Sequence, residues 1–286
     1  MTRRHQARDS ALAPFGSRLR AARAARGPLC VGIDPHPALL TEWGLHDNVA
    51  GVEVFSRTVT DALADRVSLL KPQLAFFERH GSRGMAVLEQ VIVDARSAGA
   101  LVLFDAKRGD IGSTMQAYAE AFLDPRSAFA ADAMTVSPYL GVGALRPAFD
   151  LASKHQAGVF VLARTSNPEG ASLQAAVLAD GRTVAQSVLD AVAAENVDDA
   201  PWGSVGVVVG ATLHQPVTGL DVGGPVLAPG IGAQGAQVAD LPRVFGDARS
   251  SVYPVSARGV LRAGPNVGEL RAAAQALNHE CADVLG

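Results

Sequence analysis

Eight short apolar runs recur along the chain, and most of them are followed by a stretch with the periodicity of an amphipathic helix. Each run is short enough to form one buried strand. The expected strands are residues 28–34, 67–73, 101–104, 133–137, 158–163, 205–209, 225–229 and 252–256. The expected helices are residues 52–63, 85–98, 114–122, 143–154, 183–195, 234–245 and 267–285.

This repeated alternation predicts an α/β protein with a single (β/α)8 TIM barrel over residues 27–286. A doubly wound open sheet is the alternative, because periodicity does not show whether a sheet closes. Residues 1–26 are rich in arginine and alanine, and they predict a short N-terminal helical extension that caps the domain. A transit peptide is the other interpretation of this segment, whereas a secretory signal is not expected because the segment has no continuous apolar core.

Two connections fit the alternation less well. Residues 166–183 form a long link between a strand and a helix, which is typical of an active-site lid, and a disordered insertion is the alternative. Residues 213–224 contain one proline and three glycines and have weak helical character. A regular barrel would have a helix with clear amphipathic periodicity at this point of the chain.

Composition narrows the class of protein. The 286 residues are 48% hydrophobic and 19% charged, with a formal net charge of −3, so we expect no general attraction to nucleic acid or to an anionic membrane. No apolar run approaches the roughly 20 residues that cross a bilayer. Cys30 and Cys281 lie at opposite ends of the chain and are expected to be buried free thiols. These features predict a soluble cytoplasmic enzyme or binding protein.

Charged residues follow three successive predicted strands. Asp34 ends the first, Lys71 ends the second, and Asp105 and Lys107 follow the third, with Asp110 just beyond. In extended backbone, Asp105 and Lys107 point to the same side. In a barrel all five charges would share one rim, where the alternation of sign favours the charged form of each lysine and acid. A solvated loop is the other interpretation of such a charged run.

A helix is predicted directly after this cluster. Ser113 followed three residues later by Gln116 has the spacing of a capping box, which indicates a helix start near Thr114.

The second candidate site combines two loops near the end of the chain. Residues 229–235 are glycine-rich and follow the seventh predicted strand, and Arg258 with Gly259 follows the eighth. Glycines let backbone N–H groups approach an anion, and an arginine can donate two hydrogen bonds to phosphate. Barrels often hold phosphate at these two strand ends, so we expect a phosphate site here. The seven histidines show no metal-ligand spacing and no cysteine pair is present, so no metal site is expected.

The run Asp105-Ala-Lys107-Arg-Gly-Asp110-Ile111 resembles the Asp-x-Lys-x-x-Asp motif of orotidine 5′-phosphate decarboxylases. The longer bacterial type found in mycobacteria and their relatives is the most similar. The resemblance extends over nearly the whole chain. Its other segments are residues 32–35, 71–73, 111–114, 135–141, 164–168 and 229–235, together with Arg258.

The resemblance implies a decarboxylase that converts orotidine 5′-phosphate into uridine 5′-phosphate in pyrimidine biosynthesis without a cofactor or a metal. It implies that Lys107 protonates C6, that Asp105 faces the substrate carboxylate, and that Lys71 holds the charged array and contacts the ribose. Asp34 would bind a ribose hydroxyl. Asp110 would complete the site of the partner subunit in a homodimer.

The remaining substrate contacts implied by the resemblance lie further along the chain. Ser137 would contact the pyrimidine, Gln234 and Arg258 would hold the phosphate, and Arg164 would begin the lid. The other expected substrate-binding residues are Thr114, Pro138, Gly232, Gly235 and Gly259.

Two other functions remain open at this stage. The Asp-x-Lys-x-x-Asp core also occurs in barrel lyases of the hexulose-phosphate synthase kind, which use a divalent metal and an enediolate intermediate. A non-catalytic protein that binds nucleotide phosphates is the third possibility, although it would have no evident use for the complete array of charges.

Overall fold

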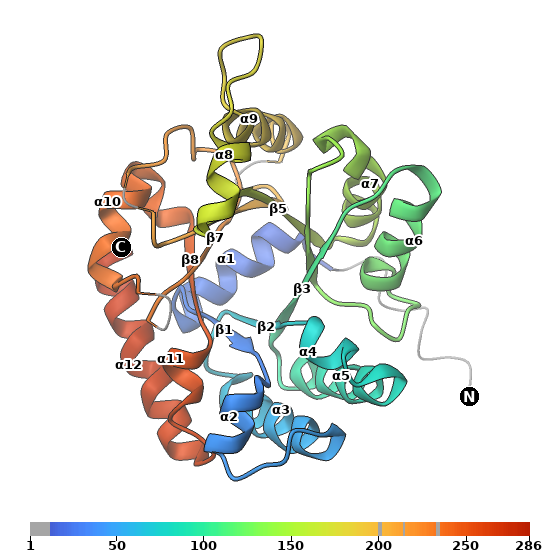
Figure 1. The fold of residues 1–286 in the computed structure, drawn as a ribbon, viewed down its shortest axis with the longest axis vertical. Coiled ribbons are helices and arrows are strands. Elements are labelled where there is room, and N and C mark those ends of the chain that lie inside the picture. Colours follow the sequence, from blue (N-terminus) through green and yellow to red (C-terminus); the bar gives the residue numbers. More distant parts are fainter. Residues whose placement is uncertain (1–11, 200–201, 214, 233–234) are drawn as a thin grey trace.

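Eight parallel strands close into a barrel in the computed structural model, which describes residues 12–199, 202–213, 215–232 and 235–286. The strands follow one another around the barrel in chain order, with β8 paired to β1 (Figure 1). They are β1 (Cys30–Ile33), β2 (Leu69–Pro72), β3 (Leu101–Arg108), β4 (Ala133–Val136), β5 (Gly158–Arg164), β6 (Val205–Val209), β7 (Val226–Pro229) and β8 (Val252–Ser256). The predicted (β/α)8 barrel is confirmed, and an open sheet is excluded.

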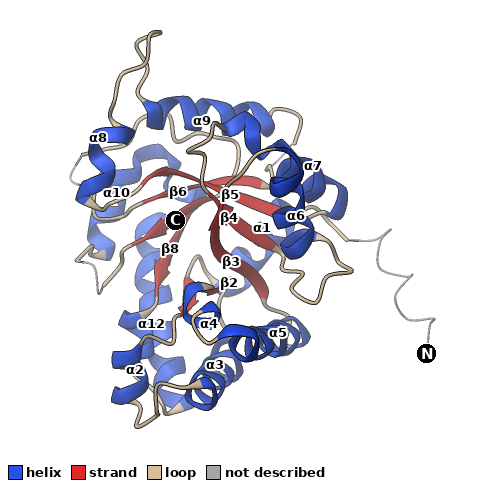
Figure 2. Ribbon diagram, turned by 45° about the vertical axis from the view of Figure 1, so that its right-hand side comes forward, coloured by secondary structure: helices blue, strands red, loops and turns tan. Residues whose placement is uncertain are grey.

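Helices surround the strands, as the ribbon coloured by secondary structure shows (Figure 2). The α-helices are α1 (Phe15–Arg26), α2 (Pro37–Glu42), α3 (Val49–Leu63), α4 (Ala75–Glu78), α5 (Gly81–Ser97), α6 (Gly112–Leu123), α7 (Arg146–His155), α8 (Ala171–Gln174), α9 (Val184–Glu195), α10 (Leu241–Phe245), α11 (Arg258–Leu261) and α12 (Val267–Leu285). The 3-10 helices are η1 (Val142–Leu145), η2 (Pro168–Gly170), η3 (Val238–Asp240) and η4 (Gly246–Ser251). No helix in the described part of the chain is long and apolar enough to span a membrane.

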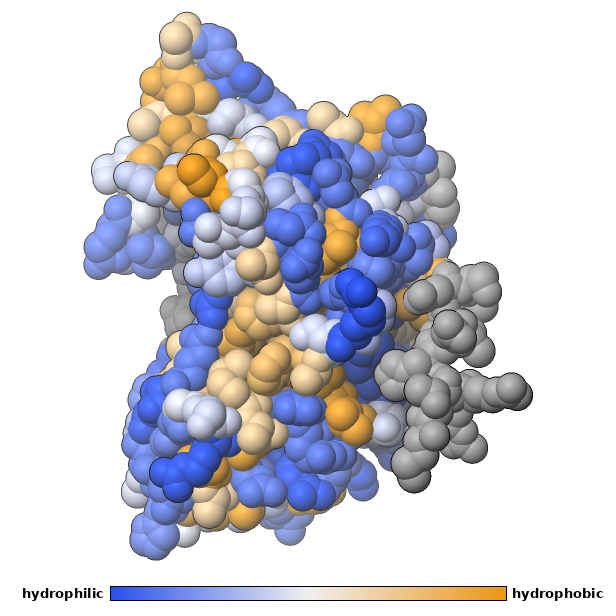
Figure 3. All heavy atoms as spheres, turned by 90° about the vertical axis from the view of Figure 1, so that its right-hand side faces the viewer, coloured by the Kyte–Doolittle hydropathy of each residue, from blue (hydrophilic) through white to orange (hydrophobic). Residues whose placement is uncertain are grey.

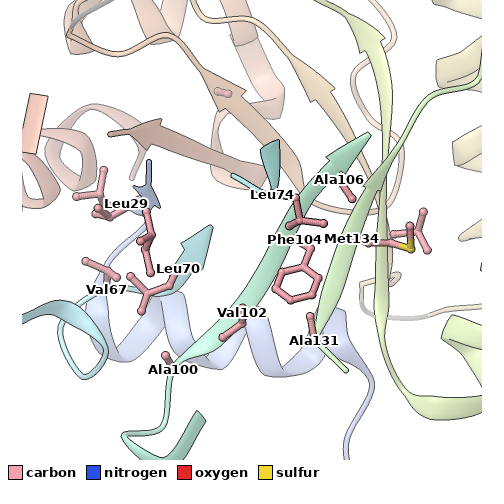
Figure 4. Packing of buried hydrophobic residues seen from close by; sticks show 14 of the residues in the cluster. Leu29, Val67, Leu70, Leu74, Ala100, Val102, Phe104, Ala106, Ala131 and Met134 are labelled. Atoms are coloured by element: carbon pink, nitrogen blue, oxygen red, sulfur yellow. The ribbon is translucent and has the colours of Figure 1, made fainter. Parts of the chain in front are cut away.

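The helices bury the apolar faces that their periodicity predicts. In α3, the Asn48 side chain accepts a hydrogen bond from the Gly51 N–H at 3.0 Å and caps the first turn. Outward-facing strand residues complete this layer of the core, as Leu70, Phe104 and Met134 show in Figure 4. This packing holds the strands in place, and so it positions the charged residues at their carboxyl ends.

The N-terminal helix α1 closes one mouth of the barrel. It crosses the barrel in Figure 1, and its side chains Phe15 and Leu19 are fully buried. They share one apolar cluster with residues that begin the strands, such as Cys30 and Leu69. Because α1 covers the amino ends of the strands, the carboxyl ends form the mouth at which the charged residues gather.

One predicted helix cap and one predicted helix start are wrong. Helix α6 begins at Gly112 with Ile111 as its N-cap and no capping side chain, so the expected Ser113–Gln116 capping box does not form. The Asp110 carboxylate instead accepts a hydrogen bond from the Ile111 N–H at 2.8 Å, just ahead of the helix.

The helix expected over residues 234–245 is much shorter, since α10 covers only Leu241–Phe245 after the single turn of η3. The capping box between Gln237 and Asp240 fixes this later start.

The two irregular connections differ from each other. Residues 166–183 are not a disordered insertion, because they contain η2, α8 and an antiparallel bridge between Val177 and Thr183. The Gln174 side chain ties this segment to Thr165 by accepting from its N–H at 2.9 Å and donating to its hydroxyl at 2.7 Å. The described residues of 213–224 form no helix, as their weak periodicity predicts.

Candidate active site

Three charged side chains form a chain of ion pairs at the carboxyl ends of β2 and β3. Lys71 Nζ donates to Asp105 Oδ2 at 2.9 Å, and Lys107 Nζ donates to the other oxygen, Asp105 Oδ1. Lys71 and Asp105 are buried, whereas 45% of the Lys107 side chain is exposed at the open mouth. One carboxylate therefore bridges a buried ammonium and an ammonium that a ligand in the mouth could reach.

Lys107 reaches this position through an unusual backbone conformation. Its φ is +48°, in the left-handed region that residues with a Cβ rarely adopt, so the extended backbone expected through Lys107 is wrong at this residue. The pairing of β3 with β4 also shifts here, because Phe104 is paired with Met134 while Arg108 is paired with Val136. Conformations of this kind persist only where the surroundings hold them, and they concentrate at functional sites.

Thr135 of β4 stands opposite this irregularity. It is 1% exposed, its Oγ1 accepts a hydrogen bond from the Lys107 N–H at 2.9 Å, and the same hydroxyl donates to Asp105 Oδ1 at 3.0 Å. Sequence analysis did not single out Thr135 as a site residue. The available signal was a polar residue inside an apolar run, two positions before Ser137.

The charges of neighbouring side chains determine the ionisation of the buried residues Lys71 and Asp105. Burial alone would raise the pKa of Asp105, but Lys71 and Lys107 outweigh it and hold that pKa well below its usual range. Burial would likewise lower the pKa of Lys71, but Asp105 and Asp34 outweigh it and hold that pKa above its usual value. Lys71, Asp105 and Lys107 are called the charged array from here on. This array keeps one carboxylate ionised between two ammonium groups, as the alternating signs predict.

Asp34, which follows β1, departs from that expectation. Its pKa is raised, because burial and the charge of Asp105 outweigh the opposing charges of Lys71, Lys107 and Arg258. Its Oδ1 is fully buried and has no hydrogen-bond partner among the described residues, and Ser256 Oγ at the end of β8 is in the same condition. Buried polar atoms without a hydrogen-bond partner are rare in folded proteins. Where one occurs, a bound ligand can supply the missing partner.

The other predicted residues of the β3–β4 side lie around this array without joining it. Ser137 and Pro138 follow β4 and are half-buried, and the Ser137 N–H donates to the Arg108 carbonyl at 2.7 Å. Asp110 is half-buried, and among the described residues no salt bridge joins it to either lysine of the array. Thr114 lies exposed on α6. In this chain, Asp110 and Thr114 are therefore separate from the charged array.

The two predicted halves of the phosphate site come together. Gly232, in the loop after β7, has φ +79°, and a Cβ added there would lie 3.7 Å from the Cα of Gly259 at the start of α11. Gly235 also has a positive φ and donates its N–H to the Gly232 carbonyl at 2.9 Å. Arg258 is exposed beside them. Gln234 lies outside the described residues.

The predicted lid residue Arg164 ends β5 and is half-buried. Its carbonyl accepts a hydrogen bond from the Gly210 N–H at 2.9 Å, which anchors the start of the 166–183 connection to the end of β6. In the described part of the chain, no group of three or more His, Cys, Asp or Glu side chains is arranged to hold a metal ion.

Comparison with known proteins agrees with this arrangement. Residues 27–273 match the model of the orotidine 5′-phosphate decarboxylase / HUMPS family. The chain belongs to this family. An orotidine 5′-phosphate decarboxylase of Streptomyces coelicolor is 64% identical over 263 residues, which are 91% of this chain and 94% of that protein. One from Corynebacterium glutamicum is 50% identical over 263 residues, which are 90% of this chain and 94% of that protein.

Solved structures of orotidine 5′-phosphate decarboxylases share the fold over nearly the whole chain. A crystal structure of a candidate orotidine 5′-phosphate decarboxylase from Streptomyces avermitilis has a TM-score of 0.94 and 59% identity, covering 97% of this chain and 98% of that one. The OMP decarboxylase of Leishmania donovani has a TM-score of 0.77 and 31% identity, covering 95% of this chain and 99% of that one.

Proposed function

We propose that the chain decarboxylates orotidine 5′-phosphate to uridine 5′-phosphate in pyrimidine biosynthesis, using its own side chains without a cofactor or a metal. One observation carries the proposal: the ionised Asp105 is held between Lys71 and Lys107 at the open mouth of the barrel. The family match and the 64% identical relative with this activity support the same reaction.

The proposed chemistry uses this array directly. Loss of carbon dioxide from C6 leaves an electron pair in the plane of the pyrimidine ring, where conjugation does not spread its charge. The exposed ammonium of Lys107 donates a proton to C6, which forms the C–H bond, and the resulting neutral amine regains a proton from water. Asp105 faces the departing carboxylate and, with Lys71, keeps Lys107 in position. Lys71 also contacts the ribose in this proposal.

The phosphate is assigned to the strand ends of β7 and β8, and the ribose and pyrimidine to residues that follow β1 and β4 beside the charged side chains. We assign the phosphate to Gly232, Gln234, Gly235, Arg258 and Gly259, a set supported by the close approach of Gly232 to Gly259. We assign a ribose hydroxyl to Asp34, whose unpartnered Oδ1 needs a donor. Ser137 and Pro138 would contact the pyrimidine, with Arg164 at the base of a lid over it. Binding energy from the phosphate would help to orient C6 against Lys107.

We further propose a homodimer in which Asp110 and Thr114 reach the partner's site. Asp110 is outside its own array, and large apolar side chains are exposed both at the next residue and in the segment after β4: Ile111 by 63% and Leu140 by 53%. On the face that carries α6, apolar side chains lie across the middle between hydrophilic regions (Figure 3). Apolar surface of this kind is typical of an interface between subunits.

A complementation experiment tests the shared site. Lys107→Ala and Asp110→Asn are each expected to be inactive as homodimers. After mixing and subunit exchange, heterodimers would contain one site with both groups intact, so activity should return to about a quarter of the wild-type value. Failure of the mixture to regain activity, with exchange verified by differential tagging, would show that Asp110 acts in its own subunit.

A metal-dependent lyase of the hexulose-phosphate synthase kind is the second candidate, since the family name includes HUMPS. The three contacts to Asp105, from Lys71, Lys107 and Thr135, favour the decarboxylase, because ammonium and hydroxyl donors already occupy both carboxylate oxygens. The deciding experiment supplies purified protein with orotidine 5′-phosphate plus a chelator and, separately, with sugar phosphates plus magnesium. Conversion to uridine 5′-phosphate with the chelator present supports the proposal. Turnover only of sugar phosphate with magnesium would replace it with the lyase.

The proposal places the enzyme in the cytoplasm. Cys30 and Cys281 are buried free thiols, as expected from the sequence, and such thiols suit a reducing compartment.

A further inference from the structure

Thr135 is placed inside an irregular segment of the sheet. Phe104 pairs with Met134 and Arg108 pairs with Val136, so residues 105–107 of β3 all lie opposite the single residue Thr135 of β4. A strand with extra residues at one point leaves part of its backbone outside the regular ladder of hydrogen bonds. The Lys107 N–H is such a group, and Thr135 Oγ1 accepts from it at 2.9 Å.

The same hydroxyl makes a second contact in the opposite direction. Its single hydrogen is donated to Asp105 Oδ1 at 3.0 Å, which is the oxygen that the Lys107 ammonium also contacts. One buried hydroxyl therefore connects the backbone of Lys107 to the carboxylate that holds the Lys107 side chain. Thr135 as a whole is only 1% exposed, so water does not easily replace either hydrogen bond of its hydroxyl.

The backbone conformation of Lys107 makes this connection consequential. A φ of +48° is disfavoured for a residue with a Cβ and persists only where surrounding contacts impose it. The hydrogen bond to Thr135 is such a contact, and it acts at the residue whose side chain must reach the reacting carbon.

We infer that Thr135 is a positioning residue, which holds Lys107 and Asp105 in their reactive arrangement through the Lys107 N–H···Oγ1 and Oγ1–H···Asp105 hydrogen bonds. The inference rests on the proposed decarboxylation and adds to it a residue that does not itself touch the substrate. Without the hydroxyl, Lys107 can relax toward extended backbone and move its ammonium away from C6. Since a displacement of about 1 Å can lower a rate by about 100-fold, the consequence falls on kcat.

Three variants test this role. Thr135→Val keeps the shape of the side chain but removes both hydrogen bonds, and Thr135→Ser keeps the hydroxyl. Thr60→Val is the matched control, because Thr60 is also 1% exposed and its hydroxyl donates to the Ser56 carbonyl at 2.8 Å within α3, away from the array. Each variant is assayed for kcat and KM with orotidine 5′-phosphate, for inhibition by uridine 5′-phosphate, and for thermal unfolding.

The expected results distinguish an effect on the position of Lys107 from an effect on the stability of the fold. Thr135→Val should lower kcat by about 100-fold. Its KM and its inhibition constant for uridine 5′-phosphate should stay within about threefold of wild type, since ribose and phosphate contacts are intact. Thr135→Ser should keep kcat within about threefold of wild type. Thr60→Val should keep wild-type kcat even where its unfolding temperature falls as far as that of Thr135→Val.

Several results would overturn the inference. A kcat for Thr135→Val equal to that of Thr60→Val would show that Thr135 only fills space. A loss in Thr135→Ser as large as in Thr135→Val would show that the hydroxyl and its two hydrogen bonds are not what holds Lys107 in position. If Thr135→Val does not fold, Thr135→Ala takes its place with the same expected loss of kcat. Absence of turnover by the wild type would instead contradict the proposed function, so the two failures are distinguishable.

Discussion

Gly109 lies directly against the backbone of Ser137, so close that a Cβ on Gly109 would overlap the Ser137 carbonyl oxygen. A second contact holds the same two segments together, since the Ser137 N–H donates to the Arg108 carbonyl at 2.7 Å. Gly109 thus lets the end of β3, which carries the charged array, approach the residue proposed to contact the pyrimidine.

Gly109→Ala is predicted to separate these two strand ends. The added methyl group meets backbone, which has no side-chain freedom to move away, so overpacking should destabilise the fold by about 1–3 kcal/mol. Activity should fall at least about tenfold, because Ser137 and Lys107 would no longer keep their positions relative to each other. Steady-state kinetics and chemical unfolding of the variant check both values.

Gly143→Ala is the matched control for this prediction. Gly143 is exposed in η1, and a Cβ added there meets no atom within 4 Å. Equal activity of the two alanine variants would show that the close approach of Gly109 to Ser137 has no part in catalysis.

Asp34→Asn is predicted to stabilise the protein at neutral pH while weakening substrate binding. Burial raises the pKa of Asp34 above the value of about 3.9 for the unfolded chain. The unfolded state then binds fewer protons than the folded state, so Asp34 lowers stability as pH rises from about 4 through its folded pKa. The neutral asparagine avoids this loss, so the variant should be more stable than the wild type at pH 7.

Thermal unfolding at pH 4 and pH 7 measures this difference. The advantage of Asp34→Asn should be present at pH 7 and nearly absent at pH 4, while KM for the substrate rises. Asp61→Asn, an exposed acid of α3, serves as the control and should show no such dependence. A variant less stable than wild type by the same margin at both pH values would contradict the prediction.

Arg18→Ala is predicted to loosen the helix that closes the barrel. Arg18 Nη1 pairs with Asp132 Oδ1 at 2.5 Å, and Asp132 Oδ2 accepts a hydrogen bond from the Val102 N–H at 2.9 Å. Removal of the arginine leaves the buried Asp132 carboxylate without its cation, which should cost about 3 kcal/mol. Urea unfolding of Arg18→Ala checks the loss.

The exposed Arg20 on the same helix gives the control variant Arg20→Ala, which should stay within about 0.5 kcal/mol of wild type. Equal unfolding curves for the two variants would show that the Arg18–Asp132 pair does not hold α1 on the barrel.

The sequence predicted the barrel well because its strands are buried on both faces. Each strand is a short apolar run, and all eight runs became strands within a few residues of the expected bounds. Helix ends were harder to predict. The Ser113–Gln116 spacing matched a capping box, but the helix starts at Gly112, directly after the Asp110 carboxylate accepts a hydrogen bond from the Ile111 N–H, which the spacing does not reveal.

The charges at the strand ends were predictable, whereas their local geometry was not. Parallel strands bring their carboxyl ends to one rim, so Lys71, Asp105 and Lys107 could be grouped from their positions alone. The left-handed Lys107 and its contact with Thr135 depend on how β3 pairs with β4, which is a tertiary property. The raised pKa of Asp34 likewise depends on its burial, which the sign of its neighbours does not indicate.

The most direct test of the account is the absorbance change of orotidine 5′-phosphate with a chelator present, for wild type, Lys107→Ala and Lys154→Ala. Lys154 lies exposed near the end of α7, and with Lys71 and Lys107 it makes up all the lysines of the chain. Wild type and Lys154→Ala should convert the substrate to uridine 5′-phosphate, while Lys107→Ala should lose at least about 1000-fold in rate. No turnover by folded wild type, or equal rates for the two variants, would contradict the account.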